Sequence, residues 1–188
     1  AAVERTGQTG TLLEATLDNN LADVLRAKND YAGAESLFRK SLAIGESLIG
    51  SNSLFVATAL QNLGIMARER KEYGEAVTYY NRALAIRERL LGPDHPSLAG
   101  VLTNLANIYR ATGNDQKALE IHFRALSMWE KSVGPYGRET LLVVGNIART
   151  YAGAGDIENA LKFQRRADAI LEMQLSLYVA TGSERQKL

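Results

Sequence analysis

The sequence predicts an all-α protein, a right-handed superhelical solenoid of four helix-turn-helix repeats with about eight helices. Two series of residues recur every 42 positions without exception: Asn20, Asn62, Asn104 and Asn146, and Ala34, Ala76, Ala118 and Ala160. Apolar residues spaced for one face of a helix lie between them, and glycines follow at regular places. A period of this length is typical of stacked helical repeats, so an array is predicted.

Each repeat is predicted to contain a helix, a short turn, a second helix and a closing glycine. In the first repeat the helices run from about Thr11 to Lys28 and from about Tyr31 to Ile49, and Gly50 stands at the expected C-cap. The turn between them falls at Asn29, where Gly113 and Gly155 stand in the third and fourth repeats. The predicted organisation is a tail at residues 1–10, one repeat domain over 11–180 with units at about 11–50, 53–92, 96–134 and 138–180, and the start of a further, truncated helix at 181–188.

Small residues are predicted to line the seam inside each hairpin. Ala22 and its equivalents Gly64, Ala106 and Ala148 are expected to face the invariant alanine series, which lets the paired helices approach closely. At the left-handed turn position the second repeat carries Lys71, for which the sequence gives no reason.

Composition narrows the classes of function. The chain has 188 residues and a net charge of +1, which argues against nucleic-acid binding driven by bulk charge. It has no cysteine, which excludes disulfides, thiolate metal sites and a cysteine nucleophile. No apolar run approaches the roughly 18 residues of a membrane span, so no membrane association is predicted and the expected location is cytoplasmic. The chain does not begin with Met, and we expect it to be part of a longer protein.

The third repeat carries the pattern of a known family. Its Leu102, Leu105-Ala106, Tyr109, Gly113, Ala118 and Ala125 resemble the tetratricopeptide repeat. The 42-residue period and the link GPDHP resemble the long variant of kinesin light chains. The first repeat departs most, with Asp18 and Ser41 where the other repeats carry apolar residues or alanine, and is expected to be an end unit or one covered by an upstream neighbour.

The last twelve residues carry a second resemblance. The stretch LYVATGSERQKL is similar to the one that follows the repeats in bacterial proteins whose C-terminal part is a caspase-like CHAT domain. Ser183-Glu184-Arg185-Gln186 fits a capping box that would open a new helix. The resemblance implies a repeat sensor joined to a protease-like effector, whose His and Cys are not in this chain.

The family resemblance implies that the first helices of the repeats line a concave inner face. On these helices the side away from the core carries carboxamides, with arginines one to two turns further along. Each Asn offers a donor and an acceptor to a peptide backbone, and each Arg can bind a carboxylate through two hydrogen bonds. The predicted peptide-binding residues are Asn20, Gln61, Asn62, Arg68, Thr103, Asn104, Asn107, Arg110, Asn146 and Arg149. The expected partner is a protein or peptide with an acidic residue or a C-terminal carboxylate.

Structural roles for the same residues stay open. The repeated Asn could satisfy groups on neighbouring helices and serve stability alone, and an Arg on a helix is often solvated or paired internally. Asp23 and Glu69 are expected to neutralise Arg26 and Arg68, whereas Arg110 has no acidic neighbour on its stripe.

Other candidates for chemistry are interpreted as structural. His95 is a turn residue in the link between repeats, and His122 occupies a packing position, so no metal site, cofactor or enzymatic activity is predicted. The aromatic and sulfur-containing residues are assigned to core and seam rather than to a ligand cage: Trp129, Met128, Tyr79 and Tyr80. The predicted function is a non-catalytic protein-interaction scaffold. The alternative is a structural or self-assembly module that uses end faces or outer helices, so homo-oligomer formation stays open.

Overall fold

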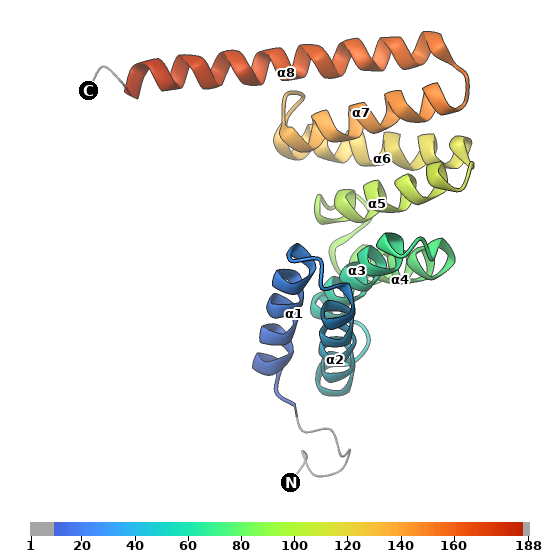
Figure 1. The fold of residues 1–188 in the computed structure, drawn as a ribbon, viewed down its shortest axis with the longest axis vertical. Helices are drawn as coiled ribbons and strands as arrows, with labels where there is room; N and C mark the ends of the chain where they lie inside the picture. The colour runs from blue at the N-terminus through green and yellow to red at the C-terminus, as the bar shows by residue number, and fades with distance from the viewer. Residues whose placement is uncertain (1–9, 186–188) are drawn as a thin grey trace. The chain divides into compact units, whose positions relative to one another are not determined.

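Eight α-helices make up the part of the chain that the computed structural model describes, residues 10–185 (Figure 1). They are α1 (Leu12–Ala27), α2 (Tyr31–Ile49), α3 (Leu54–Glu69), α4 (Tyr73–Leu91), α5 (Ser97–Ala111), α6 (Asp115–Val133), α7 (Arg138–Gly153) and α8 (Ile157–Arg185). No strand occurs within this range, and none of its helices has the length and apolarity that a membrane span requires. The predicted all-α class and its four helix-turn-helix repeats are confirmed.

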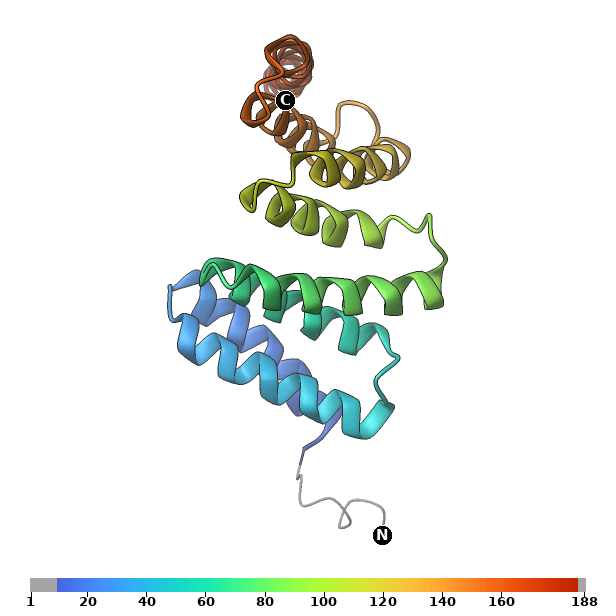
Figure 2. The same cartoon turned by 90° about the vertical axis from the view of Figure 1, so that its right-hand side faces the viewer.

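The chain forms two compact units, each with two hairpins. Unit 1 is Ala1–Pro93 with α1 to α4, and unit 2 is Asp94–Leu188 with α5 to α8. In unit 1, α1 packs on α2, α2 on α3 and α3 on α4; the two hairpins are seen side by side in Figure 2. In unit 2, α5 packs on α6, α6 on α7 and α7 on α8, and α5 also contacts α7. The single domain predicted over 11–180 stays a prediction.

Capping side chains and glycines set the helix ends. Asp30 Oδ1 accepts a hydrogen bond from the Gly33 amide at 3.0 Å, and Ser53 Oγ accepts one from the Val56 amide at 3.2 Å. The second helices of the first three repeats end at Gly50, Gly92 and Gly134, whose φ values are 77°, 89° and 82°. These angles are easily reached only by glycine, which explains why glycine closes each of the first three repeats.

The turn inside each hairpin uses one left-handed residue. Asn29, Gly113 and Gly155 have φ values of 64°, 77° and 79°, as the sequence predicts. Lys71 has a φ of 63° at the equivalent position. The second hairpin therefore holds a lysine in a conformation that costs roughly 1–2 kcal/mol for a residue with a Cβ atom.

The hairpin seams are closed by small residues, as expected. In unit 1, Ala22 and Ala34 are fully buried together with Phe38, Leu63 and Met66. A Cβ atom on Gly64 would lie 2.7 Å from the ring of Tyr80, so this glycine makes room for an aromatic side chain. Unit 2 buries the equivalent alanines of its own hairpins.

The departures in the first repeat serve local contacts. The buried Ser41 hydroxyl donates to the carbonyl oxygen of Ala15 at 2.7 Å and so ties α2 to α1. Asp18 pairs with Lys40 at 3.1 Å, and the same lysine pairs with Glu14 at 2.8 Å. Polar groups here replace the apolar contacts that the other repeats make at these positions.

The C-terminal helix differs from the expected organisation. A new helix was expected in 181–188, with a capping box at Ser183, but α8 is one continuous helix from Ile157 to Arg185. Residues 186–188, and residues 1–9 of the tail predicted at 1–10, lie outside the described residues.

Candidate functional site

In each unit, the predicted site residues lie on the first helix of each hairpin: α1 and α3 in unit 1, α5 and α7 in unit 2. In unit 1, Asn62 on α3 donates from its side-chain amide to Asn19 Oδ1 on α1 at 3.2 Å. Gln61 beside it is half-buried, and its side-chain oxygen is buried without a hydrogen-bond partner among the described residues. Asn20 is exposed on α1. This hydrogen bond uses one of the two N–H donors of the Asn62 side chain.

The arginines of unit 1 are neutralised locally, as expected. Arg26 pairs with Asp23 at 3.2 Å. Arg68 forms an ion pair with Glu69, its neighbour along the chain. A carboxylate that approached either arginine would compete with the acidic partner already there.

In unit 2, residues in the middle of α5 are half-buried, and the hydroxyl group of one of them already forms a hydrogen bond within the helix. The Thr103 hydroxyl donates to the carbonyl oxygen of Ala99 at 2.8 Å, which is a common arrangement for threonine within a helix. Asn104, one residue along, lines a pocket together with Thr103. Both predicted site residues thus lie at one hollow of the surface.

Further along, three elements bring polar groups together. Asn107 Oδ1 and Arg110 Nε on α5, and both ring nitrogens of His122 on α6, are buried without a hydrogen-bond partner in the part of the chain that the structure describes. On α7, Arg149 is exposed and donates to Asn146, which is only 7% exposed. Because buried polar atoms normally have partners, this cluster is unusual.

The pKa of His122 reflects the positive charge of this cluster. The side chain is fully buried, and the equivalent residues in unit 1 are the buried Phe38 and Tyr80. Burial is the main cause that lowers the pKa of His122, and together with the positive charges of Arg110 and Arg149 it brings this pKa to about 4. The two guanidinium groups therefore both act on one buried residue. This unit holds positive charge from two first helices in one region.

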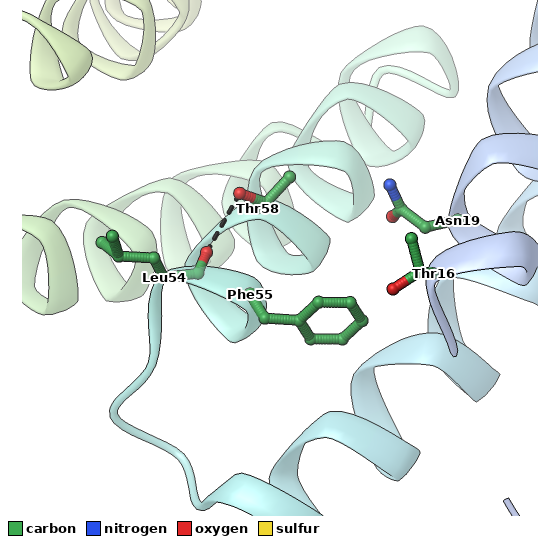
Figure 3. Close-up of a pocket in the computed structure, with 5 residues that line it drawn as sticks. All are labelled: Thr16, Asn19, Leu54, Phe55 and Thr58. Carbon is green, nitrogen blue, oxygen red and sulfur yellow. Dashed lines mark hydrogen bonds between the residues drawn. The ribbon is translucent and has the colours of Figure 1, made fainter. Parts of the chain in front are cut away.

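A pocket lies between the first helices of unit 1. It has a volume of about 310 Å³ and is lined by Thr16, Asn19, Leu54, Phe55 and Thr58 (Figure 3). In Figure 3 the Phe55 ring of α3 points toward Thr16 and Asn19 of α1, while the Thr58 hydroxyl donates to the carbonyl oxygen of Leu54 at 3.0 Å. No charged side chain is among these lining residues.

Unit 2 has a pocket at the equivalent place. It has a volume of about 210 Å³ and is lined by Gly100, Thr103, Asn104, Trp129, Glu139, Leu142 and Val143. A shift of two repeat lengths, 84 residues, relates Thr16 to Gly100, Asn19 to Thr103 and Thr58 to Leu142. The same shift relates Phe55 to Glu139 and Gly45 to Trp129. The two pockets share a position in the repeat but differ in chemistry.

Sequence reasoning assigned Trp129 to the core and seam, together with Met128, Tyr79 and Tyr80. Tyr80 and Met128 are buried as expected, but Trp129 is half-buried and forms a wall of the pocket in unit 2. A signal was present in the repeat register. Positions 45, 87, 129 and 171 hold Gly, Arg, Trp and Leu, which differ widely in size and charge.

The remaining polar candidates have structural roles. His95 Nδ1 accepts a hydrogen bond from the Ser97 amide at 3.2 Å, as expected of a turn residue. Within residues 10–185, no group of three or more His, Asp or Glu side chains is arranged to hold a metal ion.

Four helical hairpins with small residues in their seams define a helical repeat protein. The chain belongs to the tetratricopeptide repeat family, whose model matches residues 13–89, 65–128 and 97–173. Repeats of this family generally mediate protein–protein interaction. A comparison with curated protein sequences gave no match.

Three solved structures show the same fold. BtubC (BKLC) from P. vanneervenii aligns with a TM-score of 0.80 at 23% identity, over 92% of this chain and 68% of that chain. A kinesin light chain protein of Podosopora anserina with nearly identical TPR-like repeats aligns with a TM-score of 0.72 at 21% identity, over 90% and 81%. MamA aligns with a TM-score of 0.64 at 18% identity, over 86% and 81%. The resemblance to kinesin-light-chain-like repeats is confirmed at the level of fold.

Proposed function

We propose that this chain is a non-catalytic scaffold that binds an extended peptide or protein segment along the first helices of its repeats. Unit 2 supplies the stronger site. Its Arg110 and Arg149 bind an acidic side chain or a C-terminal carboxylate, and Asn104, Asn107 and Asn146 bind the peptide backbone.

One observation carries the proposal. Asn107 and Arg110 hold an acceptor and a donor without partners among the described residues, beside a second arginine on α7. Both residues are half-buried overall, so their side chains can turn toward a ligand. A peptide offers amide donors for the asparagine and a carboxylate for the guanidinium groups. Unit 1 contributes less to anion binding because Arg68 is already paired with Glu69.

A displayed library of random twelve-residue peptides tests this function. Peptides selected on the unmodified chain should lose at least about tenfold in affinity when Asn104→Ala is combined with Arg110→Glu, because one charge-assisted contact becomes repulsive. Arg165→Glu, an exposed position on α8, matches the change in charge and should leave binding unaltered. Thermal unfolding should move little in either variant. Full affinity in the double variant would exclude the proposed site.

A second candidate function is supported by α1. Its Leu13, Leu17, Leu21 and Val24 form a stripe and are 69%, 58%, 50% and 50% exposed. The equivalent Ala59, Leu63 and Met66 on α3 are buried to 1% exposure. A second copy of the chain is a candidate to cover the α1 stripe, which would make the protein a self-assembly module. Sedimentation should then show concentration-dependent association that Leu17→Lys with Leu21→Lys abolishes. A monomer over the whole range would reject this alternative.

The proposed setting is the sensing arm of a longer cytoplasmic protein. It rests on the similarity of residues 177–188 to the stretch that precedes a CHAT domain, and the sequence downstream of Leu188 in the parent tests it. A histidine and cysteine pair spaced as in caspase-like domains would support the proposal, and an unrelated continuation would reject it.

A further inference from the structure

The pocket of unit 2 contains a carboxylate where its counterpart in unit 1 contains an aromatic ring. In unit 1 the Phe55 ring packs against Gly45, where a Cβ atom would lie 2.7 Å from the ring. In unit 2 the large and the small residue are exchanged. Trp129 stands at the position equivalent to Gly45, and Glu139 stands at the position equivalent to Phe55. The exchange places an indole wall and a carboxylate at one hollow.

Glu139 has the properties of a group that awaits a ligand. It is half-buried at the pocket, and it has neither an ion pair nor a hydrogen bond to another residue of the described chain. Its place in the first turn of α7 is favourable for a negative charge. The other residues around it are apolar or neutral, namely Gly100, Thr103, Asn104, Leu142 and Val143.

We propose that this pocket receives a cationic side chain, arginine or lysine, with its charge at Glu139 and its stem or guanidinium plane against Trp129. A cation gains from both the carboxylate and the face of an indole ring, and an arginine can contact both at once. The pocket of unit 1 lacks any charged lining residue and takes an apolar side chain instead. This inference rests on the proposed function, because it describes the peptide that the first helices bind.

The position of the pocket along α7 fixes the spacing of that peptide. Glu139 and Arg149 are ten residues apart on one helix, which corresponds to about 15 Å along its axis. An extended peptide advances about 3.3–3.6 Å per residue, so a segment running along α7 spans that distance in about four to five residues. The favoured ligand therefore carries a basic residue and an acidic residue or C-terminal carboxylate about four to five positions apart.

The first experiment isolates the pocket from the rest of the site. Trp129 is the single tryptophan of the chain, so its fluorescence reports directly on the pocket. Arginine amide at millimolar concentrations should change this fluorescence with a saturable dependence, whereas citrulline amide, which has the same shape without the guanidinium charge, should not. Equal responses to the two compounds would overturn the proposal. Arg110→Ala should leave the arginine amide response intact, so this test stands even if peptide binding at Arg110 fails.

The second experiment uses peptides and a matched pair of variants. Fluorescein-labelled decapeptides in a Gly-Ser background carry one arginine and one aspartate five positions apart, and a control set carries citrulline in place of arginine. Glu139→Gln should weaken binding of the arginine peptide about tenfold and leave the citrulline peptide unchanged. Glu158→Gln, on the exposed first turn of α8, should change neither. Loss of both peptides with Glu139→Gln would indicate a structural role, and loss of neither would reject the pocket; both results overturn the inference. If binding fails only on replacement of the aspartate, the cation pocket is wrong and the anion site stands.

Discussion

Among single residues, His122 shows the largest mismatch between a buried packing position and a polar side chain. It is fully buried at a site where unit 1 has Phe38 and Tyr80, and neither ring nitrogen has a partner within the described chain. Tyr80 also has a buried hydroxyl without a partner, and burial raises the pKa of that hydroxyl. A packing position of the repeat thus tolerates polar atoms when the ring fills the space.

The buried imidazole makes stability depend on pH. The pKa of His122 is lowered to about 4 in the folded chain against roughly 6.5 in the unfolded chain, so the unfolded state takes up the proton first as the pH falls. Stability from this residue is complete above about pH 6.5 and is lost as the pH falls toward 4. Urea unfolding should show a loss of about 2 kcal/mol between pH 7 and pH 5 that is absent in His122→Phe. Identical pH dependence in the two proteins would contradict the assignment.

Residue-scale partnerships were the least predictable from sequence. The pairing of Arg68 with Glu69 follows from adjacency, and that expectation is confirmed. The hydrogen bond from Asn62 to Asn19 joins residues 43 positions apart, and it depends on how two hairpins pack, which spacing alone does not define. The exchange of Gly45 and Phe55 for Trp129 and Glu139 is visible in the sequence only when the positions are compared across repeats. The peptide-binding roles assigned to these first helices stay predictions.

At the scale of the helix, capping residues in the sequence were sufficient to predict the bounds of α2. The bounds predicted for α2, from about Tyr31 to Ile49, agree with the structure because Asp30 caps its start and Gly50 ends it. The end of α8 was not predictable from the sequence, because Ser183-Glu184-Arg185-Gln186 fits a capping box but is also compatible with the interior of a helix.

The hairpin turn of the second repeat offers a direct test of backbone strain. Lys71 is exposed and has a φ of 63°, where the third and fourth repeats use glycine. Lys71→Gly should stabilise the protein by about 0.5–1 kcal/mol, because relief of the left-handed strain exceeds the added entropy of the unfolded chain. Lys71→Ala keeps the strain and should change stability by less than about 0.5 kcal/mol. Chemical denaturation measures both, and destabilisation by glycine would show that the lysine side chain stabilises the turn.

For the molecule as a whole, the division into two compact units predicts that damage stays local. Stability in repeat proteins is close to a sum of repeat and nearest-neighbour contributions. Each unit contains its own buried seams, so a lesion in one hairpin should chiefly affect the helices packed on it.

Ala118→Leu tests this locality. Ala118 is fully buried in the α5–α6 seam, and a leucine there should overpack it at a cost of about 1–3 kcal/mol. Amide hydrogen exchange should quicken over α5 to α7 while α1 and α2 keep their protection. Ala111→Leu, at an exposed position of α5, should alter neither stability nor exchange by a measurable amount. Uniform loss of protection over all eight described helices would show that the chain unfolds as one cooperative body.

The glycines that close the second helices allow a whole repeat to be duplicated without creating a new kind of junction. Gly92 and Gly134 share a left-handed backbone, and each is followed by proline. A duplicate of residues 93–134 spliced in after Gly134 would therefore begin and end with the junction already present there. We expect such an insertion to add one more hairpin with its own first helix. That helix would offer an additional binding position to a longer peptide.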